Sequence, residues 1–300
     1  MGKPSRADDF SRSLVPFFLN NVPKNRKKHG FICIFVLMSF SASIKMKQSI
    51  TIFFLLVCTT IMVAQADALK KKNSFQLSFG LNQIKEKTIH PKVHSGTSLL
   101  LKYTRKKEKK NRSRYNVSFL FSKIKTKYEN ATRSTNIQLK GDYGYLFNLK
   151  KTGKYQFFLG PSLSANYRLS FYPNWDESHL YWADDFSLEL SNQFQYFIND
   201  KKTLVLDLNI SAFSLFSRPE LHRNHKIDDV SAGGIIKSMH SNYQFGTVNQ
   251  AINICFQSEY QFKISDKIHQ AIVYTFDYSR FKEPLPFRNM QHNLSFKIYF

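Results

Sequence analysis

The sequence predicts an all-β fold, an antiparallel transmembrane β-barrel of about ten strands. Apolar and polar residues alternate with a period of two through most of residues 74–300, which places them on opposite faces of β-strands. Most of the alternating segments run for about 8 to 15 residues, whereas soluble strands usually have about 5 to 6 and a tilted membrane-spanning strand needs about 9 to 11. Aromatic residues make up 15% of the 300-residue chain although its mean hydropathy is −0.36. Large apolar groups are therefore interleaved with polar ones, as on a wall with one face in lipid.

Residues 46–66 predict a secretory signal peptide. Lys47 is followed by the mostly apolar stretch Ile50 to Val63, and then by Ala64-Gln65-Ala66, which puts small residues at the two positions that a signal peptidase reads. The alternative is a transmembrane helix, but the apolar stretch is short for one and Asp67 follows it directly. The sequence therefore predicts export and cleavage.

Residues 1–45 form an upstream extension. Either translation begins at Met46 and the extension is not part of the protein, or it serves as an uncleaved anchor. The barrel is predicted to occupy residues 67–300. Of the three cysteines, only Cys255 lies in that region, so it can form no internal disulfide.

The period-two pattern is clearest at the end of the chain, where Leu294, Phe296, Ile298 and Phe300 alternate with polar residues or tyrosine. A helix would scatter these apolar positions around its circumference. A soluble sandwich also alternates, but the segment lengths favour a membrane barrel. The predicted strands are Phe75–Asn82, Leu99–Tyr103, Tyr115–Ser122, Ile137–Phe147, Tyr155–Leu169, Asp185–Ile198, Leu204–Ser211, Ile252–Phe262, Ile272–Ser279 and Asn293–Phe300.

The connections between the predicted strands alternate between short and long, as in membrane barrels. The short ones are rich in basic or turn-forming residues: Arg105–Ser113, Lys150–Gly153, Asn199–Lys202 and Ser265–Lys267. The long ones are Lys85–Ser95, Ile124–Ser134, Phe171–Trp182, Ser214–Thr247 and Ser279–Met290. An even number of strands puts both termini on the same side of the membrane. The count becomes twelve if Gly234–Phe245 holds another hairpin.

The signal peptide, the ten segments and the terminal Leu294-Ser-Phe-Lys-Ile-Tyr-Phe300 together resemble outer-membrane β-barrel proteins of Gram-negative bacteria. The resemblance covers Ser74 to Phe300. It implies an integral protein of the cell outer membrane with both termini in the periplasm. It also implies that the barrel-assembly machinery reads a signal formed by Leu294, Phe296, Ile298 and Phe300.

Several charged residues fall on the polar, inward-facing side of the predicted strands. A ten-stranded barrel is narrow, so side chains of opposite sign can pair across the lumen and plug it, as buried charges require. The predicted role is then structural, adhesive or binding, and the alternative is a narrow channel. The predicted lumen charges are Lys140, Asp142, Arg168, Glu189, Asp207, Glu259, Asp277 and Lys297.

A hydrolase with a site at the extracellular rim, acting on peptides or lipids, is a further alternative. Some outer-membrane proteases of ten strands use paired acids and a histidine, with water as nucleophile. The candidate catalytic residues here are Asp184, Asp185 and His222, since acid–histidine pairs can activate water. Their spacing matches no defined motif, so the prediction is that the protein is not an enzyme. The sequence predicts no cofactor and no metal site, because His-x-x-His alone is no zinc signature.

The net charge of +23 gathers in turns and loops. The run Arg105–Arg114 would suggest nucleic-acid binding in a cytosolic protein, but here it lies in a predicted periplasmic turn, so no nucleic-acid partner is predicted. We expect the protein to be a monomer, in contact with outer-membrane lipids including lipopolysaccharide. The predicted external cations for such contacts are Lys85, Lys87, Lys92, Lys123, Lys125, Lys127 and Arg133.

Overall fold

The computed structural model describes residues 71–87, 92–126, 133–173, 180–219, 231–264 and 269–300. The predicted signal peptide (residues 46–66), the upstream extension and the candidate catalytic residue His222 lie outside these ranges. Among the described residues, no helix is both long and apolar enough to cross a membrane.

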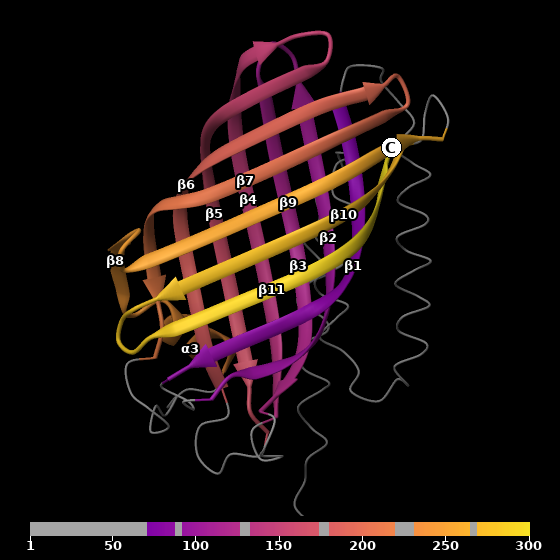
Figure 1. Cartoon of the computed structure of the whole chain (residues 1–300). Coiled ribbons are helices and arrows are strands. Elements are labelled where there is room, and N and C mark those ends of the chain that lie inside the picture. Colours follow the sequence, from indigo (N-terminus) through magenta and orange to yellow (C-terminus); the bar gives the residue numbers. More distant parts are fainter. Residues whose placement is uncertain (1–70, 88–91, 127–132, 174–179, 220–230, 265–268) are drawn as a thin grey trace, which may run out of the picture. The chain divides into compact units, whose positions relative to one another are not determined.

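Ten long strands form one antiparallel sheet that closes on itself (Figure 1). Each strand pairs with its neighbours, and the first strand also pairs with the last, so the predicted closed ten-stranded barrel is confirmed. The strands are β1 (Lys71–Glu86), β2 (His94–Glu108), β3 (Arg112–Lys125), β4 (Ser134–Lys151), β5 (Tyr155–Phe171), β6 (Leu180–Asn199), β7 (Lys202–Ser217), β9 (Ala251–Lys263), β10 (His269–Phe281) and β11 (Phe287–Tyr299).

At the seam between β1 and β11, Ser74–Glu86 of β1 pair with the whole of β11, Phe287–Tyr299. The seam extends past the end of β11, where Phe300 N donates to Asn73 O at 2.9 Å and Asn73 N donates to Phe300 O at 3.1 Å. Because every strand has two neighbours, the barrel leaves no open edge, which a membrane interior would not tolerate.

The period-two pattern of the sequence becomes an outer and an inner face of the wall. Outward-facing residues are apolar and exposed, for example Phe79, Leu163 and Leu294. Inward-facing residues such as Gln76, Asn136 and Ser295 are polar, buried in the lumen, and joined there by hydrogen bonds. The apolar face is thus turned outward, the reverse of a soluble barrel.

The two ends of the barrel differ (Figure 1). We call the end with the connections β2–β3, β4–β5, β6–β7 and β9–β10 the turn end; the C-terminus lies there too. The other end, which carries the connections β1–β2, β3–β4, β5–β6, β7–β9 and β10–β11, is the loop end. Short and long connections alternate as predicted from β1 to β9. The connection from β10 to β11, predicted as the long segment Ser279–Met290, spans only residues 282–286, because both strands reach further than expected.

The predicted connection that carries the basic run is also much shorter in the structure. The basic segment Arg105–Ser113 was expected to be a turn, but β2 continues to Glu108 and β3 begins at Arg112. Lys106 and Arg114 face each other in the register of these strands and both are buried in the lumen. Acidic side chains in the lumen accommodate these inward-facing cations, so the run of positive charge does not end the strands.

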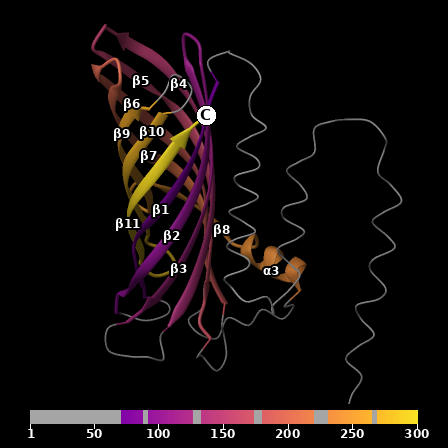
Figure 2. The same cartoon turned by 90° about the vertical axis from the view of Figure 1, so that its right-hand side faces the viewer.

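The connection between β7 and β9 holds a short helix and a short strand, α3 (Ala232–Met239) and β8 (Tyr243–Thr247). The hydroxyl of Ser231 accepts a hydrogen bond from Gly234 N at 3.1 Å and caps the helix. β8 pairs with β7 beyond the point where β9 stops. The alternative of two further barrel strands in Gly234–Phe245 is therefore wrong. Figure 2 shows α3 beside the barrel wall and not within the lumen.

Candidate functional site: the filled lumen and the outer wall

The eight predicted lumen residues come from β4, β5, β6, β7, β9, β10 and β11, and their parity places all of them on the inner face. Two pairs of them meet directly. Lys297 Nζ lies 2.9 Å from Glu259 Oε2, and Lys140 Nζ lies 3.9 Å from Asp277 Oδ1. The other four, Asp142, Arg168, Glu189 and Asp207, instead have partners that the sequence reasoning did not name.

Glu259 is the centre of the network near the turn end. Its carboxylate accepts hydrogen bonds from Lys297 at 2.9 Å, from Gln257 at 3.1 Å, from Gln261 at 2.6 Å and from the hydroxyl of Tyr299. An ionised carboxylate has about four lone-pair sites, and here one cationic and three neutral donors fill them. This arrangement links inward-facing side chains of β9 and β11, the two strands that flank β10.

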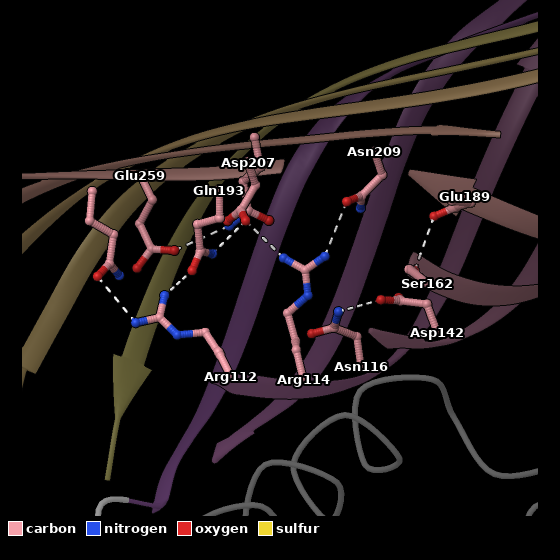
Figure 3. A network of polar contacts seen from close by, with 12 residues as sticks. Arg112, Arg114, Asn116, Asp142, Ser162, Glu189, Gln193, Asp207, Asn209 and Glu259 are labelled. Atoms are coloured by element: carbon pink, nitrogen blue, oxygen red, sulfur yellow. Dashed lines mark hydrogen bonds and ion pairs between the residues drawn. The ribbon is translucent and has the colours of Figure 1, made fainter. Parts of the chain in front are cut away.

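Two arginines of β3 reach across the middle of the lumen to the opposite wall (Figure 3). Arg114 Nη1 donates to Asp207 Oδ1 at 2.8 Å, and Nη2 donates to Asn209 at 3.2 Å. Gln193 also donates to Asp207, and Arg112 donates to Gln193. The chain of contacts therefore links β3 to both β6 and β7.

Arg112 has further partners nearer the turn end. Nη2 lies 2.5 Å from Glu108 Oε2, and the guanidinium stacks over the ring of Phe158 at 4.0 Å from its centroid. Phe158 projects inward and is fully buried. A cation lying on an aromatic face and paired with a carboxylate can be held in a nearly dry lumen.

The remaining predicted lumen charges use neutral partners. Asp142 accepts from Asn116 at 2.5 Å, and Glu189 accepts from Ser162 at 3.5 Å (Figure 3). Arg168 lies over the ring of Phe287 at 5.3 Å from its centroid. Amides and hydroxyls thus supply hydrogen bonds to Asp142 and Glu189, whereas Nε and Nη1 of Arg168 are buried and make none.

At the loop end the inner face turns apolar, and its buried side chains pack against one another. We call this cluster the loop-end seal. Phe281 stacks on Phe216 with centroids 5.1 Å apart and on Phe287 with centroids 5.6 Å apart. Its members are buried and contact one another: Ile84, Ile124, Tyr172, Tyr181, Ala183, Phe216, Ala251, Phe281 and Phe287.

A buried ion pair lies within the seal. Arg218 Nη2 donates to both carboxylate oxygens of Glu86, at 2.7 and 2.8 Å, and Tyr181 donates its hydroxyl to Glu86 at 2.7 Å. Arg218 Nη1 donates to the carbonyls of Glu283 and Leu285 at 2.7 and 2.8 Å. One arginine therefore connects β1, β6 and the β10–β11 connection.

Arg218 follows directly on the last residue of β7, and its electrostatics agree with this geometry. Burial disfavours its charge, but the neighbouring Tyr181 and Glu86 outweigh that cost and raise the pKa of the guanidinium above its usual value. The group therefore remains charged, and Glu86 keeps a partner. Burial also raises the pKa of Tyr172, a neutral member of the seal.

Two small cavities lie among the described lumen residues. A cavity of about 40 Å³ lies in the middle, next to Arg114, Lys140 and Asp207, and another of about 10 Å³ lies toward the loop end, next to Arg168 and Asp185. Spaces of this size hold a few water molecules at most. Neither is large enough to serve as a continuous aqueous path.

The structure separates the two candidate catalytic aspartates. Asp185 faces the lumen, where it accepts hydrogen bonds from Asn166 at 2.9 Å, Asn253 at 2.9 Å and Ser187 at 3.0 Å. Asp184, the adjacent residue of β6, has the opposite parity and faces outward. It is fully buried, and no side chain donates to its carboxylate. The two carboxylates therefore lie on opposite sides of the wall and do not form a pair around one water.

The segment of α3 and β8 explains why an outward-facing aspartate is buried. His240 contacts Tyr167 of β5, with Nε2 and the hydroxyl 3.3 Å apart, and Tyr243 contacts Phe186 of β6 with ring centroids 5.8 Å apart. Tyr167 is the register partner of Asp184, so this segment covers the outer wall around it.

Next to this segment the outer wall is hollowed. An apolar groove of about 580 Å³ crosses β4 to β8, with Gly141 and Ala165 among its lining residues. Aromatic side chains rise on its sides: Tyr115, Tyr143, Phe186, Phe213 and Phe245. Its surface offers almost no polar group, so it can hold apolar matter but not carry out acid–base chemistry.

Sequence reasoning missed the seal and the Glu86–Arg218 pair. A usable signal was present in the parity of the residues. Phe281 shares the parity of Asp277 and Ser279, and Ile84 shares that of Asn82. Apolar residues on the polar face, at the same end of several strands, indicate apolar packing inside the barrel there.

No protein-family model matches the sequence, and no curated protein matches it. Similar solved structures include the outer membrane protease OmpT from Escherichia coli, at 5% identity and a TM-score of 0.43 over 79% of this chain and 98% of that one. The translocator domain of autotransporter NalP from Neisseria meningitidis has 6% identity and a TM-score of 0.42 over 86% and 99%. Neisserial surface protein A has 9% identity and a TM-score of 0.33 over 75% and 95%. Similarities at this level concern the fold and do not indicate the role of this chain.

Proposed function

We propose that this chain is an integral outer-membrane barrel with a closed lumen, and that it has a structural, adhesive or binding role in the envelope. It acts through its ends and its outer wall and not as a pore. The observation that carries this proposal is the loop-end seal, in which stacked aromatic rings and the buried Glu86–Arg218 pair occupy the cross-section of the lumen.

The membrane location rests on the outer surface. The strands have 13 to 20 residues each, enough to cross the hydrocarbon core at a tilt. Outward-facing residues are predominantly apolar, and a closed barrel satisfies all of its backbone groups without water. A protein with this surface would aggregate in water, because its exposed apolar area is contiguous around the wall.

The role as a channel is disfavoured by the ion pairs in the lumen. Arg114, Asp207, Glu259 and Lys297 are bound to one another or to neutral donors in buried positions. To admit ions, these contacts must break, and each broken buried pair leaves an uncompensated charge that costs about 3–5 kcal/mol. The role as a rim hydrolase is disfavoured by the opposite orientations of Asp184 and Asp185.

Electrical recording in planar bilayers tests the proposal. The refolded barrel, with insertion verified by heat-modifiable migration on a gel, should give no stepwise current in 1 M potassium chloride, while a general porin prepared in the same way should. Regular conductance steps from the wild-type protein would show an open lumen and overturn the proposal. A chain that stays monomeric in water without detergent would overturn the membrane location.

A further inference from the structure

Three basic residues lie side by side on the outer wall near the loop end. In the strand register, Lys85 of β1 faces Arg288 of β11, and Arg288 faces Arg280 of β10. Each of the three is one residue from the loop end of its strand. We call these residues the rim cation row.

The parity of the strands turns the rim cation row outward. The residues on either side of Arg288, Phe287 and Asn289, are buried in the lumen, as are Ile84 and Glu86 on either side of Lys85. Arg288 itself is exposed, and Lys85 and Arg280 are half-buried. The three cationic groups therefore project from the wall on the membrane side and not into the barrel.

Like charges in directly opposed positions of neighbouring strands destabilise a sheet, and the row has two such contacts in succession. Among the residues that the structure describes, no carboxylate forms an ion pair with any of the three cations. Glu86, the acid next to Lys85, is turned inward and held by Arg218. Arg280 Nε is buried and makes no hydrogen bond. Within the described part of the chain, the row is therefore a set of donors without an anion.

The wall below the row is apolar. The next register line from the loop end contains Gln83, Met290, Tyr278 and Ile254, and the following one contains Leu81, His292, Phe276 and Phe256. Further on, Phe79 and Leu294 are opposed and more than half exposed. A molecule that lies along this part of the wall meets three positive charges at the rim and hydrocarbon beneath them.

We propose that the rim cation row binds the phosphate group of a membrane lipid, whose acyl chains lie on the apolar wall below. Guanidinium groups bind phosphate through paired hydrogen bonds, and adjacent lysine adds a point charge. A bound phosphate would also offset the repulsion within the row. The proposal rests on the proposed function, since it requires the barrel to stand in a membrane with the row at the level of the headgroups.

Native mass spectrometry of the full chain, refolded in detergent micelles, tests this. The probe is lipid A, a bis-phosphorylated and acylated glucosamine disaccharide, with diacylglycerol and inorganic phosphate as separate arms. Wild-type protein should retain lipid A and neither of the other two. Inorganic phosphate bound as tightly as lipid A would overturn the lipid as ligand, and diacylglycerol bound as tightly would overturn the role of the phosphate.

The matched variants are Arg288→Gln and Lys123→Gln. Lys123 also projects outward near the loop end, but its register partners are Thr97 and Thr135, so no cation faces it on the adjoining strands. Arg288→Gln should weaken lipid A binding at least about tenfold, and Lys123→Gln less than about twofold. Equal effects of the two substitutions would overturn the proposal, because they would show attraction to general surface charge.

A second measurement separates loss of binding from loss of fold. In lipid-free detergent, Arg288→Gln should unfold at the same urea concentration as the wild type or a higher one, because the substitution relieves like-charge repulsion. Added lipid A should raise the unfolding midpoint of the wild type and leave that of the variant unchanged. If the wild-type barrel is folded and closed but gains no stability from lipid A, this inference is wrong. The proposed function would still stand in that case.

Discussion

Arg218 and Glu86 form a two-bonded ion pair inside the barrel although 132 residues separate them in the chain. Neither side chain is more than 1% exposed. Glu86 is the last residue of β1, and Arg218 is the first residue after β7, so the pair spans the lumen at the loop end. It joins parts of the wall that share no backbone hydrogen bond.

The first prediction concerns this pair. Arg218→Met should lower the free energy of unfolding in micelles by about 3–5 kcal/mol, because Glu86 is left as a buried charge without its cation. Urea titration followed by the loss of heat-modifiable migration measures it. The double variant Arg218→Met with Glu86→Met should recover much of the loss, since apolar groups can replace a buried pair at little cost. Lys237→Met, at an exposed cation of α3, is the control and should have little effect. A single Arg218 variant as stable as the control would contradict the assigned contact.

The second prediction concerns two glycines of the barrel wall. A Cβ atom on Gly160 would lie 2.0 Å from Tyr145 O, whereas a Cβ on Gly141 would meet no atom within 4 Å. Gly160→Ala should therefore destabilise the barrel by about 1–3 kcal/mol, because the backbone must shift.

Gly141→Ala is the matched control for that substitution. It should leave stability unchanged or raise it by about 0.5–1 kcal/mol, since alanine loses less freedom in a strand than glycine. Both variants are compared by urea unfolding in the same detergent. Equal destabilisation by the two substitutions would show that the close approach of β4 and β5 at Gly160 is not as described.

The third prediction uses the neighbouring aspartates of β6. Asp185→Asn should destabilise the fold, because Asp185 accepts three hydrogen bonds from lumen side chains. Asp184→Asn should change the stability at neutral pH by less than about 0.5 kcal/mol, since no side chain donates to this buried carboxyl group and the neutral amide loses no partner. Asp185→Asn should thus lower the unfolding midpoint, and Asp184→Asn should leave it nearly unchanged. Destabilisation by Asp184→Asn would show that its carboxylate has a partner.

Much of the fold could be predicted from the sequence, because it follows from a single property of the residues. Alternation with a period of two depends only on which face of the wall a residue occupies, and the outward residues Leu294 and Phe296 show it directly. The same parity placed Glu259 and Lys297 on the inner face, where they meet. Strand ends were less accurate, since the basic residues Lys106 and Arg112 remain in strands once acids face them across the lumen.

The remaining features of the fold and of the site could not be predicted from the sequence, because they depend on strand register and on the structure of the long connections. The rim cation row exists only because Lys85, Arg288 and Arg280 come level across three strands, and one residue of slip would separate them. The ion pair of Glu86 with Arg218 likewise could be predicted only if the ends of both strands were known. The helix α3 lies in a connection whose composition alone did not distinguish it from a further hairpin.

The seam between β1 and β11 joins the first barrel strand to the last one and ends on the backbone of Phe300. Until the last strand is synthesised, no intermediate can complete the ring, and every partial sheet presents two rows of unpaired amides and carbonyls. Such edges are costly in hydrocarbon and are templates for pairing with other chains in water. The barrel therefore closes in a single late step of folding. A chain that lacks the last strand should be removed by proteolysis and should not accumulate as a smaller barrel.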